Sequence, residues 1–252
     1  MTTKRHPVHV VKSVSGYVSF LEKRFEEIDD VLFRGQKEDW PLLPKIARLR
    51  LRPGTDLLGT EQKMLTEFKR QAPSFVDFVP GSDWEWLSLA QHYGMATRLL
   101  DWTTNPLAAL WFAIEKPAET QCPPSLPKGS AIVWAFDPSD EDYVKEPPIG
   151  TPFSGSRTRV FRPKHIARRI AAQSGWFTVH KYIEKRKGFV PLEQQGQYKN
   201  ELTKIIVPPE HFSDIRYQLD RCGFNAASML TDLGGLGRHI EWQNSLLEDE
   251  LD

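Results

Sequence analysis

The segment from Gln91 to Ala113 gathers many chemically capable side chains in a short space. It reads QHYGMATRLLDWTTNPLAALWFA. Its polar residues are His92, Tyr93, Thr97, Arg98, Asp101, Thr103 and Thr104. Such groups could bind a polar or phosphorylated small molecule, and His92 could act on it as a general base. Alternatively, Arg98 and Asp101 form a structural ion pair and the threonines satisfy the backbone of a turn.

The helix after this cluster is expected to hold it rigidly. Asn105 can cap the helix, and Pro106 can open it because its missing N–H costs nothing there. Apolar residues then recur at helical spacing, at Leu107, Leu110, Trp111 and Ile114. This pattern predicts a buried helix. The polar cluster is therefore predicted to lie in a loop or at a strand end against the core, where binding and catalytic groups tend to collect.

A second concentration of polar side chains is basic. It comprises Arg157, Arg159, Arg162, Lys164, His165, Arg168 and Arg169. These residues could bind phosphate, of a dinucleotide or of a nucleic acid. Alternatively, the run Lys164–Arg169 forms the solvated face of a short helix predicted over Lys164–Gln173.

Familiar catalytic motifs are absent from the sequence. We find no Walker-type phosphate loop, no dinucleotide glycine fingerprint, no nucleophile elbow and no HExxH or CxxC pattern. His6 and His9 lie near a terminus that is expected to fray, and the other histidines are dispersed. We therefore expect no metal cofactor.

The composition favours a globular protein. Of 252 residues, 40% are hydrophobic, and 33 basic residues balance 33 acidic ones. Zero net charge removes a global attraction to nucleic acid or anionic membranes. The apolar run Leu107–Ile114 is too short to span a bilayer, the N-terminus lacks the apolar core of a secretion signal, and the two cysteines imply no disulfide framework. We expect a soluble cytoplasmic protein without a membrane partner.

Hydrophobic periodicity predicts both helices and strands. Helices are expected over Ser15–Ile28, after Thr60 with Met64, Leu65, Phe68 and Phe75 on one face, from Ser82 to Gly94, over Glu210–Arg221 and after Asn225. Strands are expected at Val31–Phe33, Ala131–Phe136, Trp176–His180 and Leu202–Val207. Cys122–Gly129 reads as a loop, and Asp137–Pro163 as a long loop that is either a functional lid or an insertion. Without repeats or an evident linker, a single α+β domain is predicted.

Three separated segments resemble the FRG domain, a family named for its Phe-Arg-Gly signature. The first is Phe33-Arg34-Gly35-Gln36, followed by Trp40, Leu43 and Pro44. The second is LAQHYGMATRLLDWTTNPLAALWFA, and the third is RIAAQSGWFTVH, followed by KIIVPP and a late Leu-Thr-Asp-Leu-Gly-Gly. The resemblance implies an FRG domain over residues 14–240, an N-terminal extension at residues 1–13 and an acidic C-terminal tail at residues 241–252.

A more distant resemblance, to ADP-ribosyltransferases, implies a chemistry. In that superfamily, three motifs line an NAD-binding cleft in a split, mixed sheet flanked by helices. The resemblance implies catalytic roles for four residues: Arg34 in the first motif, Thr103 and Thr104 in the second, and Gln173 in the third. It implies cofactor contacts from Gly35, Gln36, His92, Tyr93, Arg98 and Asp101.

The chemistry of each side chain supports or limits the role that the resemblance implies. The Arg34 fork suits a phosphate or ribose, and Tyr93 or Trp102 could stack on nicotinamide, although Trp102 fits the core equally well. Gln173 carries no charge to balance an oxocarbenium-like cation, which leaves open another acceptor chemistry, binding without turnover, or a plain helix-end cap. Nearby carboxylates that could replace it are Glu184, Glu193 and Glu201.

The sequence thus predicts a nucleotide- or NAD-binding cleft. The implied activity is ADP-ribose transfer to a nucleic-acid or protein acceptor, or NAD hydrolysis, and it would suit a toxin or phage-defence effector. The alternative is a non-catalytic module that binds nucleic acid or a partner protein through a basic, aromatic-lined groove.

Overall fold

A computed structural model describes residues 6–27, 30–117, 129–146, 148–163 and 175–251. Its strands form one seven-stranded sheet in the order β1-β7-β4-β2-β3-β6-β5. The strands are β1 (Val8–Val10), β2 (Leu32–Gln36), β3 (Leu99–Thr103), β4 (Ala131–Phe136), β5 (Arg159–Phe161), β6 (Gly175–Val179) and β7 (Leu202–Val207). β1 pairs with β7 in parallel, and the other neighbouring pairs are antiparallel. The predicted α+β class with a mixed sheet is confirmed.

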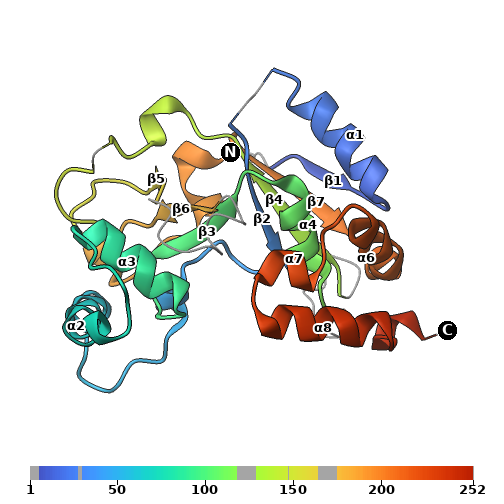
Figure 1. The fold of residues 1–252 in the computed structure, drawn as a ribbon. Coiled ribbons are helices and arrows are strands. Elements are labelled where there is room, and N and C mark those ends of the chain that lie inside the picture. Colours follow the sequence, from blue (N-terminus) through green and yellow to red (C-terminus); the bar gives the residue numbers. More distant parts are fainter. Residues whose placement is uncertain (1–5, 28–29, 118–128, 147, 164–174, 252) are drawn as a thin grey trace.

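The helices cover the sheet in two groups (Figure 1). They are α1 (Val14–Arg24), α2 (Leu57–Gln71), α3 (Asp83–His92), α4 (Pro106–Ile114), α6 (Phe212–Arg221), α7 (Ala226–Leu230) and α8 (Leu233–Gln243). One core joins α1, α4 and α6 to β2, β4 and β7, and another joins α2 and α3 to β3, β5 and β6. Phe33 of the first core is paired with Thr103 of β3, whose alternate residue Leu99 lies in the second core. Because alternate strand residues share a face, the two groups cover two halves of one sheet face.

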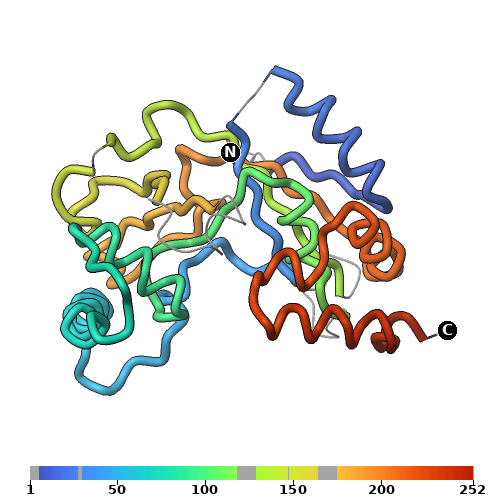
Figure 2. The backbone as a smooth tube through the Cα atoms, viewed as in Figure 1, coloured from blue at the N-terminus to red at the C-terminus, as the bar shows by residue number. Residues whose placement is uncertain are grey.

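The two halves meet where β2 and β3 diverge. These strands pair only at Phe33 and Thr103, whereas β2 and β4 pair over five residues. The tube in Figure 2 shows the chain leaving β2 and crossing toward α2 on the other half. The opposite sheet face packs against chain segments that carry Leu42, Leu192 and Tyr198. The sheet is therefore continuous but open between its two central strands.

Local sequence signals predicted several elements correctly. β4 and β7 have the predicted bounds. The Ser82 side chain accepts a hydrogen bond from the Glu85 amide at the start of α3, and Asn105 caps α4 with Pro106 as the first helical residue. These caps satisfy amides that a helix leaves unpaired, so their residue types fix the helix starts.

Other predictions were wrong, and each error has a local reason. α2 begins at Leu57, earlier than the predicted start after Thr60, because the Asp56 side chain caps it. It ends at Gln71, before Pro73, so Phe75 leaves the helix and its side chain is 82% exposed. The predicted helix to Ile28 ends at Arg24, and two helices, α7 and α8, follow Asn225. β5 lies inside the predicted long loop, and β1 lies inside the predicted N-terminal extension.

Some predictions fall outside the described residues. These are most of the loop Cys122–Gly129 and the whole helix Lys164–Gln173, including His165, Arg168, Arg169 and Gln173. The proposed limits of the FRG domain, its extension and its tail stay predictions. In the described part of the chain, no helix has the length and apolar character that a membrane span needs.

Candidate functional site

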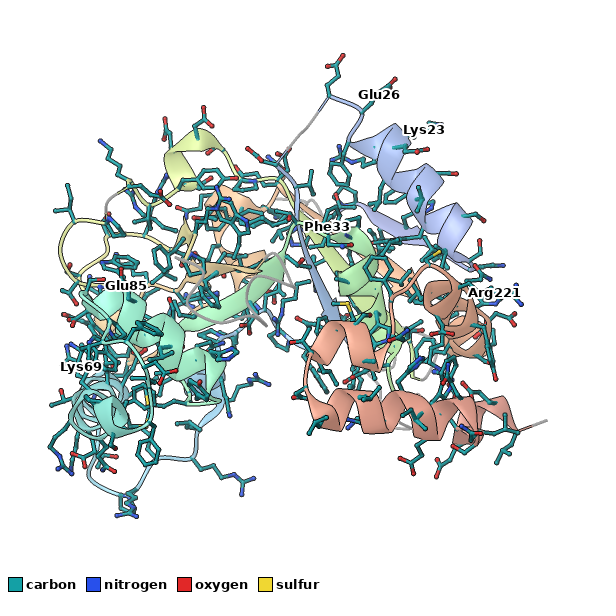
Figure 3. All side chains as sticks on the ribbon, viewed as in Figure 1. Lys23, Glu26, Phe33, Lys69, Glu85 and Arg221 are labelled. Atoms are coloured by element: carbon teal, nitrogen blue, oxygen red, sulfur yellow. The ribbon has the colours of Figure 1, made fainter. Side chains whose placement is uncertain are left out.

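The Phe-Arg-Gly signature lies on β2, and its residues point in alternate directions. Phe33 is buried in the core against α4, at the centre of the molecule in Figure 3. Gly35 lies against the backbone of α4: a Cβ there would stand 1.9 Å from the Ala109 carbonyl oxygen. Arg34, between them, faces the other side of the strand. Phe33 and Gly35 thus pack β2 against α4, whereas the Arg34 side chain does not take part in this packing.

Arg34 lines a cleft of about 390 Å³ at the divergence of β2 and β3. We call it the split cleft. Its lining residues are Phe33, Arg34, Gly35, Gln36, Lys37, Trp40, Arg48, Asp101, Trp102, Thr103, Ala109 and Phe112. Because these residues include both faces of β2, the cleft reaches into the opening between the strands. Its volume falls within the range of small-molecule sites.

Arg34 bridges the opening between the two strands. Its Nη1 donates to the Asp101 carbonyl oxygen at 2.8 Å, and the same nitrogen lies 3.8 Å from the Asp101 carboxylate. Its Nε donates to Gln36 Oε1 at 3.4 Å. Within the described residues, no acceptor is recorded for Nη2. One arm of the guanidinium fork therefore remains available for a ligand.

Burial lowers the pKa of Arg34, and the nearby Arg48 lowers it further, while Asp101 opposes both effects. The guanidinium stays charged at neutral pH because its ordinary pKa is so high. An anion in the cleft would relieve the repulsion between Arg34 and Arg48. The electrostatics therefore favour a negatively charged ligand.

A chain of hydrogen bonds fixes the groups around Arg34. Gln36 Nε2 donates to the Trp40 carbonyl at 2.8 Å, which holds Gln36 beneath the guanidinium. On the other side, Gln91 Nε2 donates to the Asp101 carboxylate at 3.0 Å, and Thr97 Oγ1 donates to Gln91 Oε1 at 2.7 Å. The network joins β2, β3 and α3. Such prior positioning lowers the entropic cost of binding.

Further charges and aromatic rings surround the opening. Lys37 lies 3.6 Å from Glu115, so its charge is largely matched, whereas Arg48 is exposed without an ion pair among the described residues. The Trp40 side chain is exposed at the cleft. Trp102 is a core residue: it is buried, and its Nε1 donates to Thr178 Oγ1 at 3.1 Å. Trp40 is thus the ring placed to stack on a ligand.

The predicted site residues are only partly brought together. Arg34, Gly35, Gln36, Asp101 and Thr103 all line the split cleft. Thr103 is buried, and its Oγ1 accepts from the Asn105 amide at 3.0 Å. Thr104, His92 and Tyr93 are not among the lining residues. Tyr93 is exposed beyond the end of α3, with its ring 4.9 Å from that of His92.

Arg98 lies elsewhere and has a structural environment. Its side chain is 1% exposed and its Nη2 lies 2.7 Å from the carboxylate of Glu61, which also accepts from Nε at 3.0 Å. Its guanidinium carbon lies 4.5 Å from the centre of the Phe153 ring. The alternative ion pair between Arg98 and Asp101 was therefore wrong: Arg98 pairs with Glu61, and Asp101 lies against Arg34.

The carboxylates considered in place of Gln173 do not line the cleft. Glu193 accepts from the Leu42 amide at 3.1 Å, Glu201 lies near Asp142, and Glu184 begins a short 3-10 helix. The carboxylate that does line the cleft is Asp101, whose side chain is 61% exposed. Asp101 was predicted as a ligand contact. Lys37, Arg48 and Phe112 line the cleft although the sequence analysis gave them no role in the site. Both basic residues follow the Phe-Arg-Gly signature in the sequence, Lys37 directly after Gln36 and Arg48 somewhat later. This position after the signature is a sequence feature that could have identified them.

In the described part of the chain, no three His, Cys, Asp or Glu side chains gather in a way that could hold a metal ion. The polar groups that do line the split cleft are two guanidinium groups, the Lys37 ammonium, the Asp101 carboxylate, the Gln36 amide and the Thr103 hydroxyl. This donor set suits a polar organic ligand bearing phosphate.

Comparison with known proteins gives one match. Residues 29–122 match the sequence model of the FRG domain, so an FRG domain is present there. The match begins before β2 and runs past α4, and it includes every residue that lines the split cleft. Neither the curated proteins nor the solved structures contain a significant match to this chain.

Proposed function

We propose that the split cleft of this FRG domain binds a nucleotide, with NAD as the expected ligand. The observation that carries the proposal is Arg34, fixed between two strands with its Nη2 open and with Arg48 beside it. The open Nη2 can donate charge-assisted hydrogen bonds to phosphate oxygens, and a second cation stabilises a diphosphate.

Aromatic groups provide the second part of nucleotide recognition. Trp40, which is exposed, and Phe112 of α4 both line the cleft. A base or nicotinamide ring stacked on Trp40 would bury apolar area and leave the phosphates toward Arg34 and Arg48. The volume of about 390 Å³ requires that part of a dinucleotide extends into solvent.

The chemistry proposed for the site is cleavage of the nicotinamide–ribose bond. The bond electrons leave with the nicotinamide nitrogen, and a nucleophile, either water or an acceptor side chain, forms the new bond to the ribose carbon and loses its proton. The Asp101 carboxylate would stabilise the positive charge that develops on the ribose. Thr103, Thr104 and Gln173 keep the proposed roles that the distant resemblance implies. An NAD-consuming effector in toxin or phage defence would use this reaction.

Calorimetry with NAD, ADP-ribose, ATP and nicotinamide tests the binding step. Arg34→Gln should weaken NAD and ADP-ribose binding by about tenfold or more, because a charge-assisted pair is lost. Arg52→Gln is the matched control, since Arg52 is exposed outside the cleft. Failure of the wild type to bind any of the nucleotides, or equal affinities for wild type and Arg34→Gln, would overturn the proposal.

A second assay separates binding from turnover. Asp101→Asn should retain NAD affinity within about threefold while nicotinamide release, followed by chromatography, falls by about 100-fold or more, because a developing cation loses its counter-charge. Nucleotide binding by the wild type without any nicotinamide release would reject the reaction and leave a binding module. Tighter, steeply salt-dependent binding of an oligonucleotide would favour the nucleic-acid alternative.

A further inference from the structure

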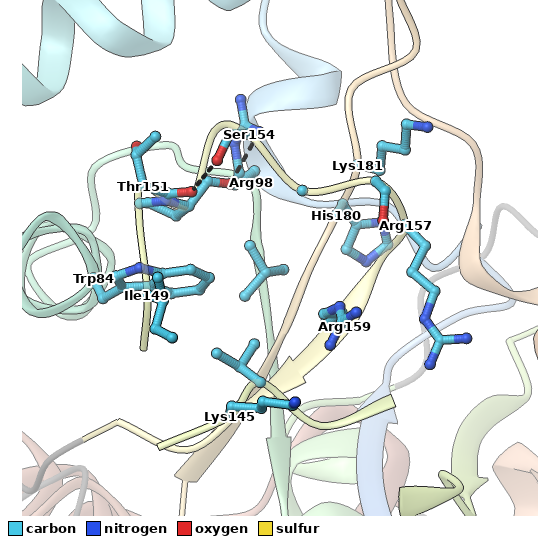
Figure 4. Close-up of a pocket in the computed structure, with 15 residues that line it drawn as sticks. Trp84, Arg98, Lys145, Ile149, Thr151, Ser154, Arg157, Arg159, His180 and Lys181 are labelled. Atoms are coloured by element: carbon cyan, nitrogen blue, oxygen red, sulfur yellow. Dashed lines mark hydrogen bonds between the residues drawn. The ribbon is translucent and has the colours of Figure 1, made fainter. Parts of the chain in front are cut away.

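A second pocket of about 300 Å³ lies at the outer edge of the sheet, beside β5 and β6. It shares no lining residue with the split cleft. We call it the basic pocket and define it by Lys145, Thr151, Ser154, Arg157, Arg159 and Lys181. Figure 4 shows these residues, with Arg159 between Lys145 and His180. Two of them, Arg157 and Arg159, belong to the basic region that the sequence singled out.

The charges of the basic pocket are not balanced. Among the residues that the structure describes, no acidic side chain lines it. Arg157 lies 3.1 Å from Asp142 and is neutralised outside the opening. Arg159 donates only to the Tyr143 carbonyl, at 3.3 Å, and neither Lys145 nor Lys181 has an ion pair among the described residues. Three cations without an ion pair among the described residues therefore line one pocket, and they favour an anionic ligand there.

Polar groups complete the lining. His180 faces the pocket without adding charge, because burial lowers its pKa to about 3, with Arg34 and Arg98 adding to the effect. The Thr151 hydroxyl accepts from the Phe153 amide and keeps its proton for another acceptor. The cations and the Thr151 hydroxyl donor together match the oxygens of a phosphate group.

The pocket wall is attached to buried parts of the protein. Trp84 Nε1 donates to the Gly150 carbonyl at 3.0 Å, and Arg98 Nη1 donates to the Pro152 carbonyl at 3.3 Å. Arg98 is itself fixed by Glu61. The loop that carries Thr151 and Ser154 is therefore held in place before any ligand arrives, which reduces the cost of ordering it on binding.

We infer that the basic pocket binds the phosphate groups of a small molecule, at a site separate from the split cleft. A small molecule fits better than a nucleic acid because the unpaired cations surround one cavity instead of following a track, and because the chain has zero net charge. Free pyrophosphate and the diphosphate of a nucleotide share the chemistry that this site would recognise.

Calorimetry with pyrophosphate as the probe tests this inference. The double variant Lys145→Gln/Lys181→Gln should weaken binding of one pyrophosphate equivalent by about tenfold or more. Both lysines are exposed, so the fold should survive, and an unchanged thermal midpoint checks this. Lys185→Gln, an exposed lysine outside the pocket, is the matched control and should bind as the wild type does. Arg159→Gln should weaken binding of the same pyrophosphate equivalent, which tests the pocket independently of the two lysines.

The cleft variant Arg48→Gln separates this inference from the proposed function. If the basic pocket binds phosphate, Arg48→Gln retains the pyrophosphate equivalent that the lysine variant loses. Loss of all pyrophosphate binding in Arg48→Gln, unchanged binding in the lysine variant, or no binding by the wild type would each overturn the inference. ADP in a parallel titration distinguishes free from nucleotide-borne diphosphate. An oligonucleotide that binds through Lys145 and Lys181 more tightly than pyrophosphate would overturn the small-molecule assignment.

Discussion

The α-carbon of Gly35 lies against the backbone of Ala109, so closely that a Cβ at residue 35 would stand 1.9 Å from the Ala109 carbonyl oxygen. It would also stand 2.7 Å from the amide nitrogen of Ala113. Both obstacles are helix backbone, which has no rotamer with which to move aside. The absence of a side chain at residue 35 therefore sets the distance between β2 and α4, and with it the position of Arg34 relative to Phe112 in the split cleft.

Gly35→Ala should destabilise the protein by about 3 kcal/mol, the upper part of the usual range for overpacking, because strand and helix must separate. Urea denaturation measures the loss. Gly237→Ala in α8 is the control: nothing lies near its added Cβ, and a helical alanine should stabilise by about 0.5–1 kcal/mol. Equal effects of the two substitutions would contradict the close contact.

Glu61→Gln should destabilise the protein by about 3–5 kcal/mol, because it leaves the Arg98 guanidinium buried without its counter-charge. The pair has side-chain exposures of 1% and 0%, so water cannot replace the lost carboxylate. Glu67→Gln, which breaks the exposed pair with Arg70 on the same helix, should change the free energy of unfolding little. Similar losses in the two variants would show that burial does not govern this pair.

Glu250→Ala should destabilise the protein by about 1–3 kcal/mol, because Glu250 satisfies a buried arginine. Its carboxylate accepts from Arg216 Nε at 3.0 Å and from Trp242 Nε1 at 3.2 Å. Arg216 also donates to the Ile114 carbonyl, at 3.1 Å. Arg216 thus links the acidic C-terminal segment to the end of α4. Glu248→Ala, at an exposed neighbour, should have no measurable effect on the denaturation midpoint.

Glu201 should make the protein less stable as the pH rises. Burial raises the pKa of Glu201 to about 7, with Asp142 and Asp137 adding to the effect and Arg157 opposing it. In the unfolded chain its pKa is about 4.3. Between these values the folded state binds the additional proton, so the free energy of unfolding falls from about pH 4.3 to about pH 7.

Glu201→Gln should remove this dependence. The variant should gain stability relative to the wild type as the pH rises from 4.5 to 8, in urea denaturation at several pH values. Glu184→Gln, at an exposed position, serves as control. Parallel curves for wild type and Glu201→Gln across this range would show that Glu201 does not titrate in the predicted window.

Elements with local sequence signals were predicted from those signals alone. The β-branched and aromatic run Ala131–Phe136 is typical of a strand that is buried on both faces. Asn105 followed by Pro106 is typical of the start of a helix. The same holds for Ser82 at the start of α3. Where a local signal was overlooked, as at Asp56 and Pro73, the predicted limits of α2 were wrong. The resemblance to the FRG domain likewise rested on short motifs within three separated segments of the chain.

Which groups from distant parts of the chain meet depends on how the elements pack in three dimensions. The sequence contains many acidic residues that could pair with Arg98. Arg98 pairs with Glu61 because α2 packs against β3 in one core. Likewise, Arg48 and Trp40 reach the same cleft as Asp101 because β2 lies between β3 and β4 and diverges from β3 after one pair. Strand order depends on closing long loops and on burying both sheet faces at once. These are properties of the whole chain, which no single segment specifies.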